Sequence, residues 1–186
     1  MNNAIFSYVR KSHLQIGEIY FWTATINGWR KLLNDEEYKL VVINSLKYLS
    51  LKKNIDVFGF VIMPNHIHLI WRINKMNGKE TAQGAFLKYT AHEFRKILLK
   101  ENGNALSAYE VVAANIKHEF WQRDSLAIHL YTPEVAFQKL DYLHNNPLAE
   151  HWQLATSPED YQYSSASYYE KNESNYDFLK DLRDEF

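Results

Sequence analysis

The chain has 186 residues, of which 46% are hydrophobic and 23% are charged, and its formal net charge is -1 at pH 7. These values lie near globular averages, so they exclude a disordered chain and a fibre and fit one domain with its own core. No cysteine is present, which excludes disulfides, thiolate nucleophiles and cysteine-ligated zinc and leaves His, Asp, Glu, Asn and Gln as candidate ligands.

Location and charge give further expectations. No apolar run approaches the roughly 18 residues of a membrane span, and the first residues lack the apolar core of a signal peptide, so we expect a soluble, cytoplasmic protein with no membrane partner. Residues 170–186 hold six acidic and three basic side chains, and the rest of the chain has 18 basic and 16 acidic ones. We expect one domain over residues 1–169 and an acidic C-terminal tail over residues 170–186. Net charge does not decide the partner.

The first half of the chain predicts a strand, a helix and a hairpin. Residues 18–26, EIYFWTATI, are β-branched and aromatic and precede an Asn-Gly turn signal, which predicts a strand. Residues 35–53 have apolar positions at helical spacing and begin with acids, as a helix N-terminus prefers. Residues 55–63 and 66–73 are predicted strands that turn back at Pro64-Asn65.

The second half adds two helices and a strand. Residues 81–100 return to a helical period, and residues 101–117 are small and polar, which predicts a loop. Residues 119–131 are a candidate fourth strand, and residues 133–146 form a predicted helix that Pro147 stops. The order βαββαβα predicts an α+β fold, a ferredoxin-like antiparallel sheet with helices packed on it.

Two histidines interrupt an apolar strand in FVIMPNHIHLIWRI. Side chains alternate along a strand, so His66, His68, Ile70 and Arg72 share one face. The other face is predicted core: Ile67, Leu69, Trp71 and Ile73. Two imidazoles spaced i, i+2 can reach one cation from a rigid platform.

The histidine pair has a plainer interpretation, two imidazoles hydrogen-bonded at a sheet surface. If the pair holds an ion, zinc is disfavoured, because cysteine is absent and few further ligands stand nearby in the sequence. A harder divalent cation, Mg²⁺ or Mn²⁺, completed by an amide oxygen, water and a substrate phosphate, fits better.

The helix at DYLHNNP places Tyr142 and Asn146 four residues apart, on one face. His144 should face elsewhere and bond a neighbouring loop. The plain alternative is that the tyrosine packs and that Asn before Pro merely ends the helix. Tyrosine, with an ordinary pKa of about 10, needs a metal or a positioned base to attack a phosphodiester. A cation at His66, His68 and Asn146 would meet that need, so the two motifs explain each other.

Five segments together resemble the HUH single-tyrosine transposases, specifically the REP-associated, insertion-sequence-200-like group. They occur in order over roughly residues 18–169: MPNHIHLIW, GAFLKYTAHEF, FWQRDS, YLHNNPLAEHW and PEDYQYSSASYY. The resemblance implies a ferredoxin-like domain with the catalytic tyrosine on the late helix, binding single-stranded or hairpin DNA.

The resemblance also implies roles for particular residues. His66, His68 and Tyr142 would be catalytic, and His66, His68 and Asn146 would hold the divalent metal, with Asn146 where related transposases carry glutamine. Tyr142 would attack the phosphorus, keep the 5′ phosphate as a phosphotyrosine and release a 3′ hydroxyl. Rejoining then needs no nucleotide triphosphate, in agreement with the absence of a phosphate-binding G-x-x-x-x-G-K-[ST] loop.

Candidate DNA contacts are the cationic side chains Lys88, Arg72, Arg95 and Arg123, of which Lys88 matches the family's pattern in FLKYTA. Lys96 lies on the same polar helix side as Arg95. The plain interpretation for each is a solvated surface charge.

Three functions remain open at this level. The first is a metal-dependent nicking and joining enzyme for single-stranded DNA, that is, a transposase. The second is a non-catalytic module that binds single-stranded or hairpin nucleic acid, domesticated from a transposase. The third is a metal phosphodiesterase that uses water instead of tyrosine. The sequence leaves the monomer and the homodimer both open, as it does the DNA sequence recognised.

Overall fold

A four-stranded antiparallel sheet in the order β2-β3-β1-β4 forms the centre of the computed structural model. The structure describes residues 14–101, 103–111, 117–123, 125–173 and 175–186. The strands are β1 (Ile19–Thr25), β2 (Ile55–Ile62), β3 (His66–Ile73) and β4 (Leu126–His129). The main helices are α1 (Glu36–Leu51), α2 (Ala82–Glu101), α3 (Pro133–Asn145) and α4 (Ala166–Lys171). The predicted α+β fold and its element order are confirmed.

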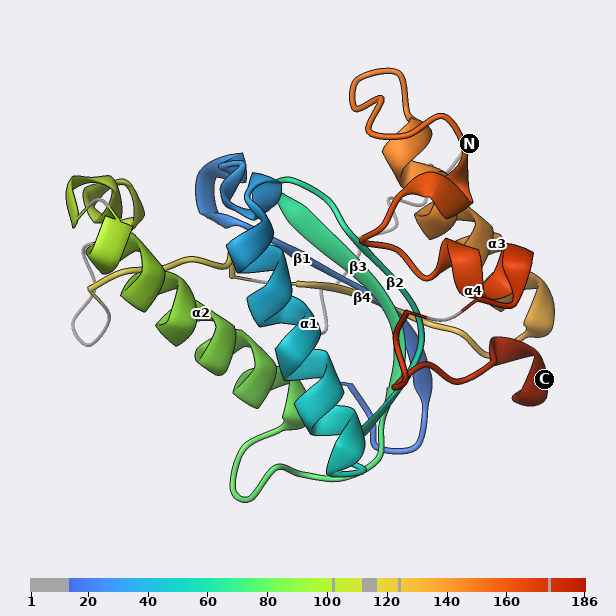
Figure 1. Ribbon diagram of the computed structural model, residues 1–186. Helices are drawn as coiled ribbons and strands as arrows, with labels where there is room; N and C mark the ends of the chain where they lie inside the picture. Colours follow the sequence, from blue (N-terminus) through green and yellow to red (C-terminus); the bar gives the residue numbers. More distant parts are fainter. Residues whose placement is uncertain (1–13, 102, 112–116, 124, 174) are drawn as a thin grey trace, which may run out of the picture.

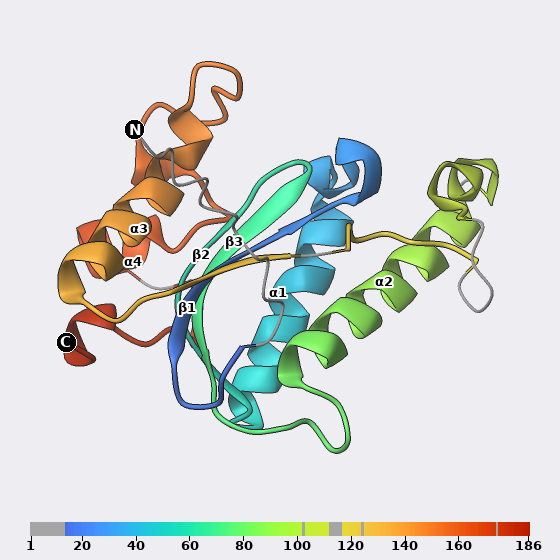
Figure 2. The ribbon, with the colours of Figure 1, turned by 180° about the vertical axis from the view of Figure 1, so that it is seen from behind.

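The helices divide between the two faces of the sheet (Figure 1). Helices α1 and α2 lie side by side on one face, and α3 and α4 lie on the other, as the reverse view in Figure 2 also shows. Helix α3 begins where Thr132 Oγ1 accepts a hydrogen bond from the backbone N–H of Val135, with Pro133 in the first turn. No helix among the described residues is both long and apolar enough to cross a bilayer.

Each face of the sheet buries its own apolar cluster. The face predicted to be core, with Ile67, Leu69 and Trp71, packs under α1 and α2, whose Val42 and Phe86 are fully buried there. The opposite face packs Phe21, Phe58, Ile70, Leu140 and Leu143 under α3. The alternation predicted for β3 is therefore confirmed, and the histidines lie on the α3 face.

Close packing of α3 depends on β2. The register of β2 on β3 shifts between Val57 and Gly59, so the regular pairing of the two strands is interrupted there. A Cβ built at Gly59 would lie 2.8 Å from Leu140 Cδ1, so the glycine leaves room for the α3 side chain. Because α3 packs closely on the sheet, Asn146 at its C-terminal end reaches His68 near the start of β3.

The predicted fourth strand is shorter than the sequence indicated. A strand over residues 119–131 was predicted, but β4 covers only Leu126–His129, and Trp121 makes an isolated bridge to Ile26. The indole Nε1 of Trp121 donates a hydrogen bond to Thr90 Oγ1 at 2.9 Å. Because the buried Trp121 side chain is hydrogen-bonded to α2, residues 119–123 run beside the end of β1 without forming a continuous strand. The predicted loop over residues 101–117 contains a 3-10 helix at Gly103–Tyr109, and residues 102 and 112–116 lie outside the described part.

The acidic segment at the C-terminus packs against β2. Leu179 forms a parallel bridge with Val57, and the backbone N–H of Lys180 donates to the Val57 carbonyl at 2.9 Å. Phe178 and Leu182 are buried, each in a different apolar cluster. Residues 178–182 thus complete parts of both cores, which the charge pattern did not indicate.

Candidate active site

Asn65 fixes the orientation of the His66 imidazole. The amide Nδ2 of Asn65 donates to the Trp29 carbonyl at 3.4 Å, which directs its Oδ1 at His66 Nδ1, 2.7 Å away. An amide oxygen only accepts, so Nδ1 of His66 carries the proton. The remaining nitrogen, Nε2, therefore carries the lone pair of the ring.

His68 is held in the same way from the neighbouring strand. Its Nδ1 lies 2.7 Å from Thr23 Oγ1, its register partner on β1. Its Nε2 lies 3.4 Å from Nδ2 of Asn146, just past the end of α3, and Asn146 also makes a hydrogen-bond contact with His66. The two imidazole centroids are 4.7 Å apart. The side-chain amide of Asn146 therefore contacts both imidazole rings.

Burial keeps both imidazoles neutral. His66 is 9% exposed and His68 is 6% exposed. Burial, with help from nearby His151, lowers the pKa of His66 to about 4, and the hydrogen-bond contact with Asn146 acts in the opposite direction. Burial, followed by the repulsion that a protonated His66 and Lys139 would exert, lowers the pKa of His68 to about 3. Neutral imidazole is the form that binds a metal ion.

Tyr142 stands beside the pair at the edge of solvent. Its ring centroid is 5.5 Å from that of His68 and 5.9 Å from that of Phe21, with edge-on geometry in both contacts. The ammonium of Lys139, one turn earlier on α3, lies 5.5 Å from the centroid of the Tyr142 ring. Tyr142 is 49% exposed, so a substrate can reach it. The four residues predicted as catalytic or metal-binding, His66, His68, Tyr142 and Asn146, are thus neighbours in space.

The donor set fits a divalent cation that accepts nitrogen and oxygen ligands. In the part of the chain that the structure describes, no three His, Asp or Glu side chains group together as a metal site. An ion at His66 and His68 would therefore depend on the amide oxygen of Asn146 and on ligands from water or substrate. Such a mixed, open donor set suits Mn²⁺ or Mg²⁺ better than a closed zinc site.

The predicted DNA contacts lie in three separate places. Lys88 and Arg95 line one hollow on α2, together with Lys117, on the sheet face away from the histidines. Lys88 also pairs with Glu80 at 2.6 Å. Arg123 lies on the histidine side, beside β1, and its Nε donates to Glu119 at 2.7 Å. Their proposed contacts with DNA stay predictions.

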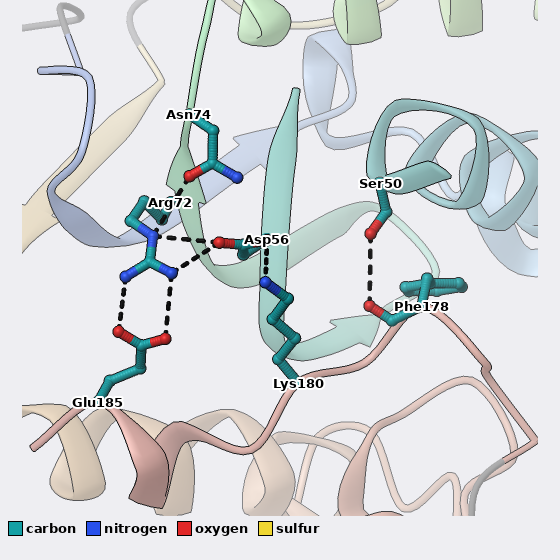
Figure 3. A network of polar contacts seen from close by, with 7 residues as sticks. All are labelled: Ser50, Asp56, Arg72, Asn74, Phe178, Lys180 and Glu185. Carbon is teal, nitrogen blue, oxygen red and sulfur yellow. Dashed lines mark hydrogen bonds and ion pairs between the residues drawn. The ribbon is translucent and has the colours of Figure 1, made fainter. Parts of the chain in front are cut away.

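Arg72 is engaged by two carboxylates at the far end of β3 (Figure 3). Its Nη2 lies 2.7 Å from Asp56 Oδ2 on β2, and its Nη1 lies 2.6 Å from Glu185 Oε2 in the C-terminal segment. Lys180 Nζ approaches the other oxygen of Asp56 at 2.6 Å. Burial opposes ionisation of Asp56, but its bonds with Lys180 and Arg72 lower its pKa below the usual value. Arg72 therefore ties the C-terminal segment to the sheet.

Asp56→Ala is expected to destabilise the fold by about 3 kcal/mol, because it leaves Arg72 and Lys180 without their shared, buried carboxylate. Urea unfolding at neutral pH measures the change. Asp177→Ala is the control, since it breaks an exposed 2.8 Å pair with Lys47 and should cost less than about 1 kcal/mol. Equal losses in the two variants would contradict the structural role assigned to Asp56.

Three side chains around the pair were missed by the sequence analysis. Asn65 directly precedes His66, and Lys139 stands three residues before Tyr142 on a helix, so local spacing contained a signal for both. Thr23 is different, because its contact with His68 depends on the register between β1 and β3. His144, expected to face away from Tyr142, does so, with Nε2 2.8 Å from Ser165 Oγ.

The fold has counterparts among solved structures. One is described as a REP-associated tyrosine transposase bound to a REP hairpin, with a TM-score of 0.60 and 14% sequence identity over 92% of this chain and 91% of that chain. The chain shares the fold of a tyrosine transposase. A second, a protein assigned as a transposase from Deinococcus radiodurans R1, gives a TM-score of 0.44 and 12% identity over 73% of this chain and 95% of that one. No family model and no curated protein matches the sequence.

Proposed function

We propose that this protein is a metal-dependent DNA transesterase of the HUH type, which nicks and rejoins single-stranded DNA at hairpins or repeats. Tyr142 is the nucleophile, and His66, His68 and Asn146 hold Mg²⁺ or Mn²⁺. When bound, the ion would polarise the scissile phosphate and neutralise charge that develops on its oxygens. Within the HUH transposases, we propose that the protein belongs to the REP-associated group.

The reaction exchanges one phosphodiester for another. The Tyr142 oxygen attacks phosphorus, the bond from phosphorus to the 3′ oxygen breaks, and the phenol loses the proton that the 3′ hydroxyl finally gains. The 5′ phosphate stays on Tyr142 until a 3′ hydroxyl attacks it. The ammonium of Lys139, 5.5 Å from the centroid of the Tyr142 ring, can offset negative charge on the phosphate during both steps.

The observation that supports this proposal most is the meeting of β3 and α3. The Tyr142 ring lies 5.5 Å from that of His68, and Asn146 contacts both imidazoles. Two separately weak motifs, some seventy residues apart in the sequence, therefore share one small, partly exposed site. Hairpin DNA as the substrate is proposed because the structural counterpart is bound to a REP hairpin.

The experiment is a covalent-trapping assay. Hairpin DNA with single-stranded flanks is labelled at its 3′ end, because the fragment that joins Tyr142 through its 5′ phosphate keeps that end. It is incubated with the protein and Mn²⁺. The expected result is a labelled protein band that survives denaturation, with the phosphorylated peptide containing Tyr142 in mass spectrometry. Cleavage without adduct would instead identify a water-dependent phosphodiesterase. Binding without cleavage would leave the non-catalytic nucleic-acid module.

A further inference from the structure

A hollow of about 190 Å³ opens beside the histidine pair, on the α3 face of the sheet. It is smaller than the roughly 300–1,000 Å³ of pockets for drug-sized ligands, which suits one flat group. Its floor is formed by Thr23 and Thr25 of β1, the register partners of His68 and His66. It is also lined by Trp29, Gln122, Arg123, Ser125 and Leu126. We refer to these seven residues as the Trp29 hollow.

The indole of Trp29 is unusually exposed. All five tryptophans lie in the described part of the chain, and Trp29 is 63% exposed whereas Trp22, Trp71 and Trp121 are buried. Leaving a large aromatic ring in water forgoes the free energy of burying it. An exposed ring at the rim of a hollow is a surface on which another ring can stack.

The backbone of Trp29 is held in a strained conformation. Its φ is 58°, in the left-handed region that bulky residues rarely adopt. Its N–H donates to the Ile26 carbonyl at 2.9 Å, and its carbonyl accepts from Asn65, which also orients His66. The conformation that presents the indole is therefore maintained by the same side chain that sets the imidazole.

Besides the indole and Leu126, the hollow is lined by polar and cationic side chains. The backbone N–H of Gln122 donates to Thr25 at 2.7 Å, which fixes this segment beside β1. Arg123 pairs with Glu119 at 2.7 Å at the surface, a contact weak enough to exchange for a phosphate. Ser125 Oγ accepts from Gln83 Nε2 at 2.9 Å, which links the rim to α2. An aromatic platform beside an arginine and hydrogen-bonding side chains is how proteins hold single-stranded nucleotides.

We propose that the Trp29 hollow holds one unpaired base of the DNA strand next to the scissile phosphate, stacked on the Trp29 indole. This inference rests on the proposed function, since the base is adjacent to the scissile phosphate only if that phosphate binds at the histidine pair. Thr23 makes the connection, because it lines the hollow and lies 2.7 Å from His68 Nδ1. Arg123 then contacts the phosphate on the outer side of that base.

The first test is binding of a fluorescein-labelled, mixed-sequence single-stranded DNA oligomer, followed by anisotropy without metal. Every protein carries Tyr142→Phe, so that cleavage plays no part. Trp29→Ala is expected to weaken binding about 5- to 150-fold, the range for loss of one stacked base, and Trp29→Phe to retain most of the affinity. Tyr48→Ala, which removes an exposed aromatic from α1 on the other sheet face, should bind like the parent.

Several results would overturn the inference. These are equal affinity of the parent and Trp29→Ala, equal losses in Trp29→Ala and Trp29→Phe, an equal loss in Tyr48→Ala, or no binding by the parent. Circular dichroism checks that each variant is folded, which is expected because Trp29 is exposed. A second measurement uses an oligomer with 5-iodouracil in place of thymine. Light should cross-link it to the peptide containing Trp29, and cross-links found only on α2 would exclude the hollow.

The hollow and the proposed chemistry can fail separately. If the wild-type protein forms the Tyr142 adduct but Trp29→Ala binds DNA unchanged, the hollow is wrong and the transesterase stands. If Trp29→Ala weakens binding but no adduct forms in wild type, the base site stands and the catalytic proposal is wrong. Binding without metal is therefore measured on the proteins that carry Tyr142→Phe, and adduct formation with Mn²⁺ is measured on the protein that keeps Tyr142.

Discussion

Tyr142→Phe is expected to lower the rate of covalent adduct formation by on the order of 10⁴-fold or more, the scale of loss when a nucleophile is removed. The substitution deletes only the phenolic oxygen. The ring can keep its edge contacts with Phe21 and His68, whose centroids are 5.9 and 5.5 Å away. We therefore expect stability to change by less than about 0.5 kcal/mol.

The control for this substitution is Tyr89→Phe. Tyr89 is 48% exposed, nearly the same as Tyr142, but lies on α2 across the sheet. It should form adduct at close to the wild-type rate. The DNA affinity of Tyr142→Phe should also stay near wild type, because the neighbouring side chains remain. Adduct at equal rates in Tyr142→Phe and wild type would remove Tyr142 as the nucleophile.

The sequence predicted the faces of the site better than its contacts. Strand and helix periods are local properties, so alternation placed His66 and His68 together, and a four-residue spacing placed Tyr142 with Asn146. The sheet order then follows from the element order and from pairing of the hairpin strands. What local periods cannot give is the register between β1 and β3, on which the contact of Thr23 with His68 depends.

Arg72 illustrates the same limit. The alternation put it correctly on the histidine face of β3, where a cation suggested contact with DNA. Its two carboxylate partners, Asp56 and Glu185, come from another strand and from the end of the chain. Nothing local in the sequence connects positions separated by 113 residues. The acidic character of the C-terminal segment was visible in the sequence, but its packing partner was not.

The expected length of the fourth strand was wrong for a related reason. Residues 119–131 include the aromatic residues Phe120, Trp121 and Tyr131, a residue type that is enriched in strands. In the structure the Trp121 side chain is buried against α2 and hydrogen-bonded to Thr90, so tertiary packing determines the backbone path there. Gln122 and Arg123, which lie on that irregular path, line the Trp29 hollow beside β1. Strand propensity alone could not distinguish these outcomes.

His68→Ala is expected to weaken Mn²⁺ binding by roughly 100-fold or more and to lower adduct formation with it, because it removes one of two imidazole donors. Thr23→Val provides a graded comparison. It keeps the imidazole but removes the hydroxyl 2.7 Å from Nδ1, and loss of such an orienting partner costs about 10- to 100-fold. Titration calorimetry with Mn²⁺ measures both variants independently of activity.

The matched control for His68→Ala is His129→Ala on β4, whose Nε2 bonds Glu18 at 2.8 Å outside the site. It should bind Mn²⁺ like wild type, since it removes an imidazole that does not face Asn146. The expected order of affinity is wild type and His129→Ala, then Thr23→Val, then His68→Ala. If all four proteins bound Mn²⁺ equally, the ion would sit elsewhere, and the pair would have only its hydrogen-bonding role on the sheet. If Thr23→Val lost as much Mn²⁺ affinity as His68→Ala, the His68 imidazole would bind the ion only when the Thr23 hydroxyl sets its tautomer and ring orientation.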